Sequence, residues 1–183
     1  MKYPKLPCAI ALLMACGSDR AIARPTTWND YTNVRFAYRA CYPNWLRAGR
    51  ESDDGDGRIF TDKFGGEMRV FGSYVAMVLI DGKEVLSSEA PAATPVRQAA
   101  DYDAKSLDRI TYQTVGRNWY VVSGRLKGKM VYWKTVTRDD RWISMQLSYP
   151  TNAASKWNPL VKHFASCLEA LPPAQFDEPV RAK

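Results

Sequence analysis

Cysteine and histidine are the first candidates for chemistry in this sequence. His163 is the only histidine among 183 residues, and Cys167 follows it by four residues, so a helix would place both side chains on one face. Together with Cys41 they could form a Cys/His metal site or an activated thiol. A structural zinc site needs four ligands, and no fourth strong ligand is spaced nearby. We therefore predict a disulfide between Cys41 and Cys167, with two free thiols or a metal or nucleophilic site as the alternatives.

An acidic turn at residues 51–57 is the second candidate. Its spacing partly matches a calcium loop in which Asp54 and Asp56 take the third and fifth ligand positions. Ser52 then takes the first position, and Lys63 takes the twelfth, where a bidentate glutamate is required. A solvated turn is the default interpretation, so Asp54 and Asp56 are kept only as candidate metal ligands.

Motifs that would identify an enzyme are missing from the sequence. It contains no G-x-S-x-G, H-E-x-x-H, P-loop or G-x-G-x-x-G pattern. His163 is the one candidate base for a Ser/His/Asp triad, and its position beside the apolar stripe of an expected helix favours a structural role. The acids at 53–56 could do acid–base work only in principle. We predict a protein without enzymatic activity and without a cofactor, with a small hydrolase as the least favoured alternative.

The first 23 residues predict export. Residues 1–23 combine a basic start, an apolar run over 8–16 and the ending Ala-Ile-Ala, which are the three parts of a secretory signal. Signal peptidase would cut before Arg24, whereas residues 13–16 resemble a bacterial lipobox in which Cys16 receives a lipid. The predicted location is periplasmic or secreted, and the alternative is a lipid anchor at Cys16 on the bacterial membrane.

Net charge and composition limit the classes of partner that the protein is expected to bind. The net charge is +7, and +5 remains after residues 1–23 are removed. The basic residues are scattered, with no run of five or more, so no nucleic-acid partner is predicted; a mild attraction to anionic surfaces is the simpler interpretation. Aromatic residues make up 12% of the chain, which favours a β-containing core.

Periodicity along the chain predicts mostly β-structure. Alternation of apolar and polar residues predicts a strand over residues 34–42. Residues 75–80 are apolar and fit either a strand or a helix. More strands are expected around Phe60 and over 67–74, 109–115, 118–126, 129–136 and 141–149. The last four are separated by short turns, which favour antiparallel hairpins.

Two helices and one domain complete the expected organisation. Thr94 can cap a mid-chain helix with Pro95 at its first position, and an amphipathic C-terminal helix is marked by apolar residues at helical spacing: Trp157, Leu160, Val161, Phe164 and Leu168. The predicted fold class is α+β, an antiparallel sheet flanked by these two helices. Residues 24–30 would form a lead-in, 31–171 the domain and 172–183 a loose tail.

Two short motifs resemble a known family. The stretch Phe36-Ala37-Tyr38, followed by Tyr42-Pro43-Asn44-Trp45, is similar to the F-x-Y-P-x-W start of Mog1/PsbP-like domains. Leu147-Ser148-Tyr149-Pro150, followed by Trp157 and the helix through Phe164, resembles their last strand and helix. The spacing around Tyr42 departs from that pattern, and the turn at 53–57 is not part of it. The resemblance covers most of residues 31–171 and implies an α/β/α sandwich that binds or helps assemble other proteins, usually without catalysis.

These observations favour an exported protein that binds an envelope or secreted protein partner, as an adaptor, assembly factor or inhibitor or immunity protein. Binding of a glycan or lipid is the alternative. Trp119, Trp133 and Trp142 are candidate binding aromatics, because tryptophan is enriched in binding hot spots, although each fits a core position as well. Contact with a membrane is expected only through a lipid anchor at Cys16.

Overall fold

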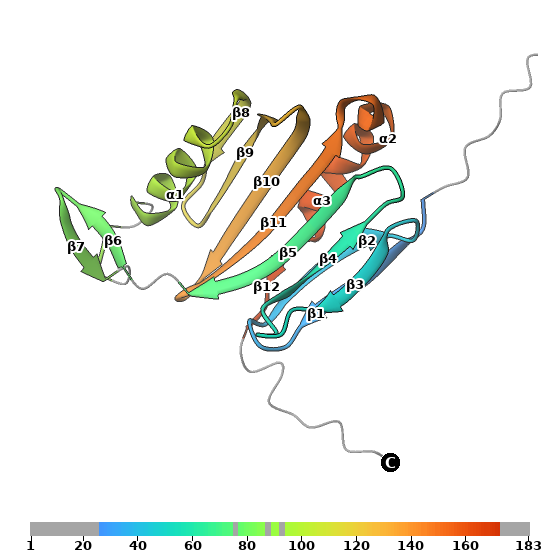
Figure 1. Cartoon of the computed structure of the whole chain (residues 1–183). Coiled ribbons are helices and arrows are strands. Elements are labelled where there is room, and N and C mark those ends of the chain that lie inside the picture. The colour runs from blue at the N-terminus through green and yellow to red at the C-terminus, as the bar shows by residue number, and fades with distance from the viewer. Residues whose placement is uncertain (1–25, 75–76, 87–88, 92–93, 173–183) are drawn as a thin grey trace, which may run out of the picture.

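The computed structural model describes residues 26–74, 77–86, 89–91 and 94–172. The predicted signal at 1–23, with Cys16, and the tail beyond residue 172 lie outside the described residues. A seven-stranded antiparallel sheet, called here the large sheet, has the order β3-β4-β5-β11-β10-β9-β8 (Figure 1). Its strands are β3 (Arg47–Glu51), β4 (Gly57–Thr61), β5 (Glu67–Tyr74), β8 (Arg109–Val115), β9 (Trp119–Leu126), β10 (Lys129–Arg138) and β11 (Arg141–Pro150).

The remaining elements form two smaller sheets and a few helices. A three-stranded sheet has the order β1-β2-β12, and β6 pairs with β7 in a separate hairpin. These strands are β1 (Trp28–Asn33), β2 (Tyr38–Pro43), β12 (Glu169–Ala170), β6 (Met77–Ile80) and β7 (Lys83–Leu86). The helices are α1 (Thr94–Lys105), α2 (Ala154–Trp157) and α3 (Val161–Cys167), with single 3-10 turns at Thr151–Ala153 and Asn158–Leu160. None of the helices in the described part of the chain is long and apolar enough to cross a bilayer.

The late hairpins confirm the strands predicted from 109 to 149. The β9–β10 turn has Lys127 and Gly128 at φ angles of 49° and 77°, the left-handed pair that a tight two-residue hairpin turn requires. This turn aligns Leu126 with Lys129 and so sets the register of β9 against β10. The next turn aligns Arg138 with Arg141 and sets the register of β10 against β11. The long-range partner of β11 is β5, where Leu147 lies opposite Met68. The predicted α+β class is confirmed.

The strand predicted over residues 34–42 is confirmed over residues 38–42, which lie in β2, and is wrong over residues 34–37. The chain makes a hairpin there: β1 ends at Asn33, residues 34–37 form a turn, and β2 begins at Tyr38. Buried Asn33 stabilises the turn, because its Oδ1 accepts the Phe36 N–H at 2.8 Å, and Ala37 adopts a φ of 47°. Moreover, β1 starts at Trp28, inside the range 24–30 that was expected to be a lead-in.

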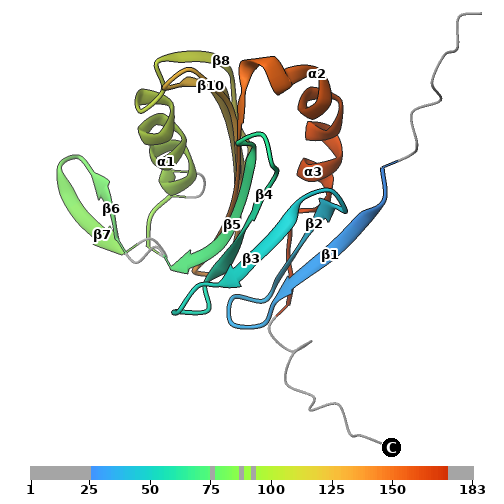
Figure 2. The same cartoon turned by 45° about the vertical axis from the view of Figure 1, so that its right-hand side comes forward.

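The layers follow from which faces are apolar. Helix α1 covers one face of the large sheet, while α2, α3 and the three-stranded sheet cover the other (Figure 2). The second face holds the main core, centred on Phe60, Met68, Leu147, Trp157 and Phe164. Of the predicted C-terminal stripe, Trp157, Phe164 and Leu168 are buried, and Leu160 and Val161 are half-buried. The helix is interrupted between α2 and α3, where Pro159 lies and cannot donate a backbone hydrogen bond.

Candidate protein-binding groove and the predicted site residues

Cys41 and Cys167 are joined by a disulfide that links β2 to the end of α3, with Cα atoms 5.5 Å apart. His163 lies beside it: one of its ring nitrogens and the two sulfurs all lie within 4.8 Å of one another. The imidazole packs on Trp28, with ring centroids 3.9 Å apart. Thiolates are the species that bind metals or attack substrates. Because both sulfurs are in the disulfide, this cluster acts as a crosslink.

The acidic turn is organised by hydrogen bonds of its own. The Ser52 hydroxyl accepts the Asp56 N–H at 2.9 Å and donates to the Asp56 carboxylate. Asp54 is exposed. Within the described ranges, the one group of three potential metal-ligating side chains lies around the disulfide instead. A metal at Asp54 and Asp56 stays a prediction, and the observed contacts are those of a solvated hairpin loop.

Next to this turn, polar side chains connect the two sheets. Glu51 accepts hydrogen bonds from the Tyr31 hydroxyl and from Asn33 Nδ2, the latter at 3.1 Å, and it pairs with Arg58 at 2.9 Å. Burial, followed by the bond to Glu51, raises the pKa of Tyr31 above its ordinary value. The phenol therefore stays protonated and acts as a donor at neutral pH. We assign this cluster a structural role in joining β1 to β3 and β4.

The three candidate tryptophans do not form one site. Trp119 lies opposite Val136 in the sheet register and so faces the α3 side. Trp142, 7% exposed, is buried beneath α1 on the opposite face. Trp133 lies on that same face, half-buried, in a row with Gln146 and Arg69. Only Trp142 lines the groove described next.

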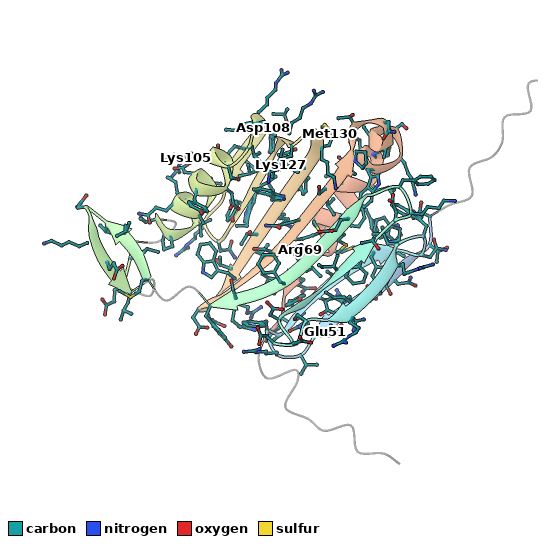
Figure 3. The ribbon with its side chains drawn as sticks, in the orientation of Figure 1. Glu51, Arg69, Lys105, Asp108, Lys127 and Met130 are labelled. Carbon is teal, nitrogen blue, oxygen red and sulfur yellow. A yellow bond between two sulfur atoms is a disulfide. The ribbon has the colours of Figure 1, made fainter. Side chains whose placement is uncertain are left out.

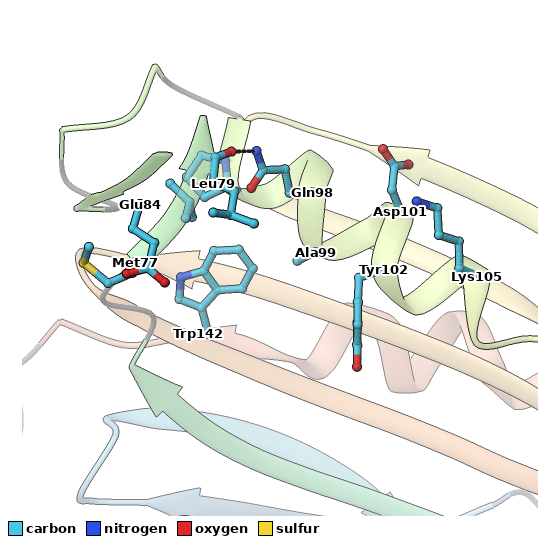
Figure 4. A pocket seen from close by; sticks show the side chains of 11 residues that line it. Met77, Leu79, Glu84, Gln98, Ala99, Asp101, Tyr102, Lys105 and Trp142 are labelled. Atoms are coloured by element: carbon cyan, nitrogen blue, oxygen red, sulfur yellow. Dashed lines mark hydrogen bonds between the residues drawn. The ribbon is translucent and has the colours of Figure 1, made fainter. Parts of the chain in front are cut away.

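A groove of about 600 Å³ lies between the β6–β7 hairpin and α1. Figure 4 shows Met77 and Leu79 on the hairpin side, Tyr102 on the helix side and the Trp142 ring between them. Gln98 of α1 donates its side-chain N–H to the Leu79 carbonyl. That hydrogen bond holds the hairpin against the helix.

The rim of this groove exposes apolar side chains. Leu79 is 56% exposed and Tyr102 is 77% exposed, and Met77, Leu86 and Tyr74 are also exposed on or beside the hairpin. A two-stranded hairpin is marginally stable alone, and clustered exposed apolar residues mark interaction surfaces. The arrangement is suited to receiving an apolar segment of another protein.

The helix wall of the groove rests on β9 through a partly buried polar contact. The Tyr120 hydroxyl donates to Asp103 Oδ2 at 2.6 Å. Burial raises the pKa of Asp103, and the hydrogen bond from Tyr120 offsets part of that rise. Burial also holds the pKa of Tyr120 above its ordinary value. The Tyr120 phenol is therefore the donor, and this contact positions α1 on the sheet.

The sequence analysis recognised the Asp81-Gly82 turn but did not find the groove. Asp81 and Gly82 have φ angles of 50° and 77°, as the hairpin requires. That turn signal, applied to the apolar run before it, could have identified β6 as a strand. The packing of the hairpin beside α1 has no local signal, because it depends on contacts between separate elements.

Comparisons with known proteins bear on the fold. The sequence matches no protein-family model and no curated protein. The solution structure of cyanobacterial PsbP (CyanoP) from Synechocystis sp. PCC 6803 is similar, with 15% sequence identity and a TM-score of 0.50; the match covers 86% of this chain and 98% of that chain. The PsbP-like fold expected from the short motifs is confirmed, and at this identity the likeness shows the fold alone.

Proposed function

We propose that this chain is an exported envelope protein that binds another protein and catalyses no reaction. The observation that carries the proposal is the groove between β6–β7 and α1, whose exposed rim is apolar. The fold resembles that of cyanobacterial PsbP, and a groove at a helix and a hairpin is compatible with that fold. An adaptor, assembly factor or inhibitor would each use such a surface.

The partner expected here is a protein segment with two or three apolar side chains. Leu79 and Tyr102 stand on opposite walls of the groove, so such a segment would contact the hairpin and the helix together. Asp101 and Lys105 line the helix side and could select polar groups at its edge. Burial of a few apolar side chains contributes about 1.5–3 kcal/mol each, before the ordering of the partner is subtracted.

Site-directed photocrosslinking tests this function. A photoreactive residue replaces Tyr102 in one variant and Tyr112, an exposed tyrosine of β8 on the other side of the sheet, in the matched control. Both are expressed in the native envelope and analysed by mass spectrometry. We expect one stoichiometric protein partner from position 102, lost when Leu79→Ser is added. Equal capture from both positions, or capture unaffected by Leu79→Ser, would remove the groove as the binding site.

Glycan binding is the second candidate, and Trp133 favours it. Its half-buried ring lies in a cross-strand row with Gln146 and exposed Arg69, on a part of the large sheet beyond β8 and β9, which α1 contacts. Sugars stack on such rings and bond to neighbouring polar groups. Retention on envelope polysaccharide that Trp133→Ala abolishes and Tyr102→Ala leaves intact would favour this function over protein binding.

A further inference from the structure

Basic side chains gather at one end of the large sheet, called here the basic end. It comprises Lys63 in the β4–β5 turn, Arg125, Lys127 and Lys129 around the β9–β10 turn, Lys156 in α2, and the aromatic ring of Phe64. The two turns touch, because Lys129 Nζ donates to the Gly65 carbonyl at 3.3 Å. Figure 3 shows Lys105 and Lys127 toward this end and Glu51 toward the opposite one.

Apart from Lys156, which lies 4.0 Å from Asp62, these charges have no ion-pair partner among the described residues. Among the described residues, no carboxylate lies within 4.0 Å of the charged groups of Lys63, Arg125, Lys127 or Lys129. Arg125 even lies directly opposite Arg109 in the β8–β9 register, and like charges so placed repel each other. An external anion would relieve that repulsion.

Three acidic side chains lie near the basic end, and each contacts a neighbouring group of the protein. Asp108 accepts the Lys127 backbone N–H at 2.6 Å, and Glu67 pairs with Arg69 at 3.4 Å. The Asp62 side chain is 2% exposed, with Lys156 at 4.0 Å. The five basic side chains of the basic end outnumber these three carboxylates, which leaves this end with a net positive charge.

Phe64 is held in an exposed position by the structure beneath it. Asp62 Oδ1 accepts the backbone N–H groups of Phe64 and Gly66 at 2.7 and 2.8 Å, and its Oδ2 accepts Trp157 Nε1 at 3.3 Å. These bonds order the turn while leaving the Phe64 ring 61% exposed. The Lys63 and Lys156 ammonium groups lie 5.0 and 5.8 Å from the ring centroid. An exposed aromatic ring flanked by lysines is typical of a surface that contacts lipid headgroups.

The chain also enters the domain at this end. Asn44 donates its backbone N–H to the Thr27 carbonyl at 2.9 Å, and the next residue, Trp45, shares a hollow of about 320 Å³ with Phe64 and Lys156. Thr26 follows Cys16 by ten residues, a length that cannot exceed about 36 Å. If Cys16 carries a lipid, the basic end is the end tethered near the bilayer.

We propose that the basic end binds the surface of an anionic bilayer, with Phe64 entering the headgroup region and the lysines around it contacting lipid phosphates. Each basic residue near such a surface strengthens binding about fivefold. The binding belongs to residues 26–172 and needs no lipid anchor. It leaves the groove at β6–β7, which is a different site, free for a protein partner.

Vesicle sedimentation tests the proposal with the chain from Arg24 onward, the form that signal-peptidase cleavage would yield. Vesicles of phosphatidylcholine alone are compared with vesicles of phosphatidylcholine and phosphatidylglycerol in equal parts. We expect partition onto the anionic vesicles only, weakening as salt is raised. Changing Lys63, Lys127 and Lys129 together to Gln should lower it about a hundredfold. Phe64→Ala should lower it roughly tenfold.

Lys83→Gln is the matched control, because Lys83 is an exposed lysine in β7, away from the basic end; its effect should stay within about twofold. Unchanged circular dichroism would show that each variant folds. Equal binding to both vesicle types, or an equal loss with Lys83→Gln, would overturn the proposal. So would failure to bind vesicles while an acidic protein or a nucleic acid binds and is lost in the triple variant. None of these outcomes affects the photocrosslinking test of the groove.

Discussion

The two faces of the large sheet are covered in different ways. On the α3 face, large side chains such as Phe60, Trp157 and Phe164 are fully buried, and the disulfide joins β2 to α3. On the α1 face, the helix contributes only small buried side chains, Val96, Ala100 and Ala104, against Tyr120, Val122 and Trp142. The first face carries most of the apolar burial, and the second carries the groove.

The smaller apolar burial on the α1 face explains why a binding surface can lie there. Apolar stabilisation grows with the area removed from water, so α1, which buries only Val96 and two alanines, is held less firmly than α2 and α3, which bury Trp157 and Phe164. Binding sites are drawn from the less stable parts of a fold. The groove between α1 and β6–β7 fits that pattern.

Replacing a buried tryptophan on each face gives the largest expected effect. Trp157→Ala should lower the free energy of unfolding by about 3–5 kcal/mol, because the ring is fully buried, stacks on Tyr149 and Phe164, and binds Asp62. Trp142→Ala should cost at least about 1 kcal/mol less, because one side of that ring lines the groove. Urea unfolding measures both. Equal losses of unfolding free energy in the two variants would contradict the claim that the α3 face carries more of the stability.

Removing the disulfide is the next largest change. The double variant Cys41→Ser, Cys167→Ser should lose about 2–5 kcal/mol of unfolding free energy, because the crosslink closes a loop of 126 residues. Hydrogen exchange should quicken in β2 and α3 more than in α1. A free-thiol assay on the unfolded, unreduced protein should find none at Cys41 and Cys167; two would contradict the crosslink.

Asp103 should give the α1 face a pH dependence. Because burial raises its folded pKa, the folded chain holds more protons than the unfolded chain between the two pKa values. The contribution of Asp103 is therefore most favourable below its unfolded pKa of about 3.9 and is lost as the pH rises through the folded value. Asp103→Asn should remove this slope when unfolding is measured across that range. Asp101→Asn, an exposed carboxylate on α1, is the matched control, and an unchanged slope in Asp103→Asn would contradict the assignment.

Two leucines give the sharpest contrast and the smallest single effect. Leu79→Ser on the groove rim should change stability by less than about 0.5 kcal/mol, since the side chain is already exposed. Leu147→Ser, in the main core, should cost several times more. Thermal unfolding compares the two variants. A large loss for Leu79→Ser would mean that the hairpin is part of the core and not a binding rim.

Local patterns determined a large part of this structure. The strands β8 to β11 follow from alternation and short turns, and the stripe through Trp157 and Phe164 predicted which C-terminal residues are buried. The disulfide followed from the cysteine count, because only Cys41 and Cys167 remain beyond residue 23. Such features depend on neighbours along the chain, which the sequence displays directly.

Alternation also misled at one place. Residues 34–42 alternate as a single strand would, yet Asn33 and Ala37 turn the chain between β1 and β2. A period of two looks the same on one strand as on a turn followed by a strand. The turn forms here because Asn33 is buried and makes hydrogen bonds that require β3 to lie nearby.

Only the tertiary structure decided where the surfaces lie. The lysines at 63, 127, 129 and 156 are scattered in sequence. They come together because the β4–β5 turn, the β9–β10 turn and α2 lie at the same end of the large sheet. The groove likewise joins a hairpin to a helix that have no local relation. Charge patches and grooves depend on distances between remote segments, and those distances are set when the strands pair and the helices pack.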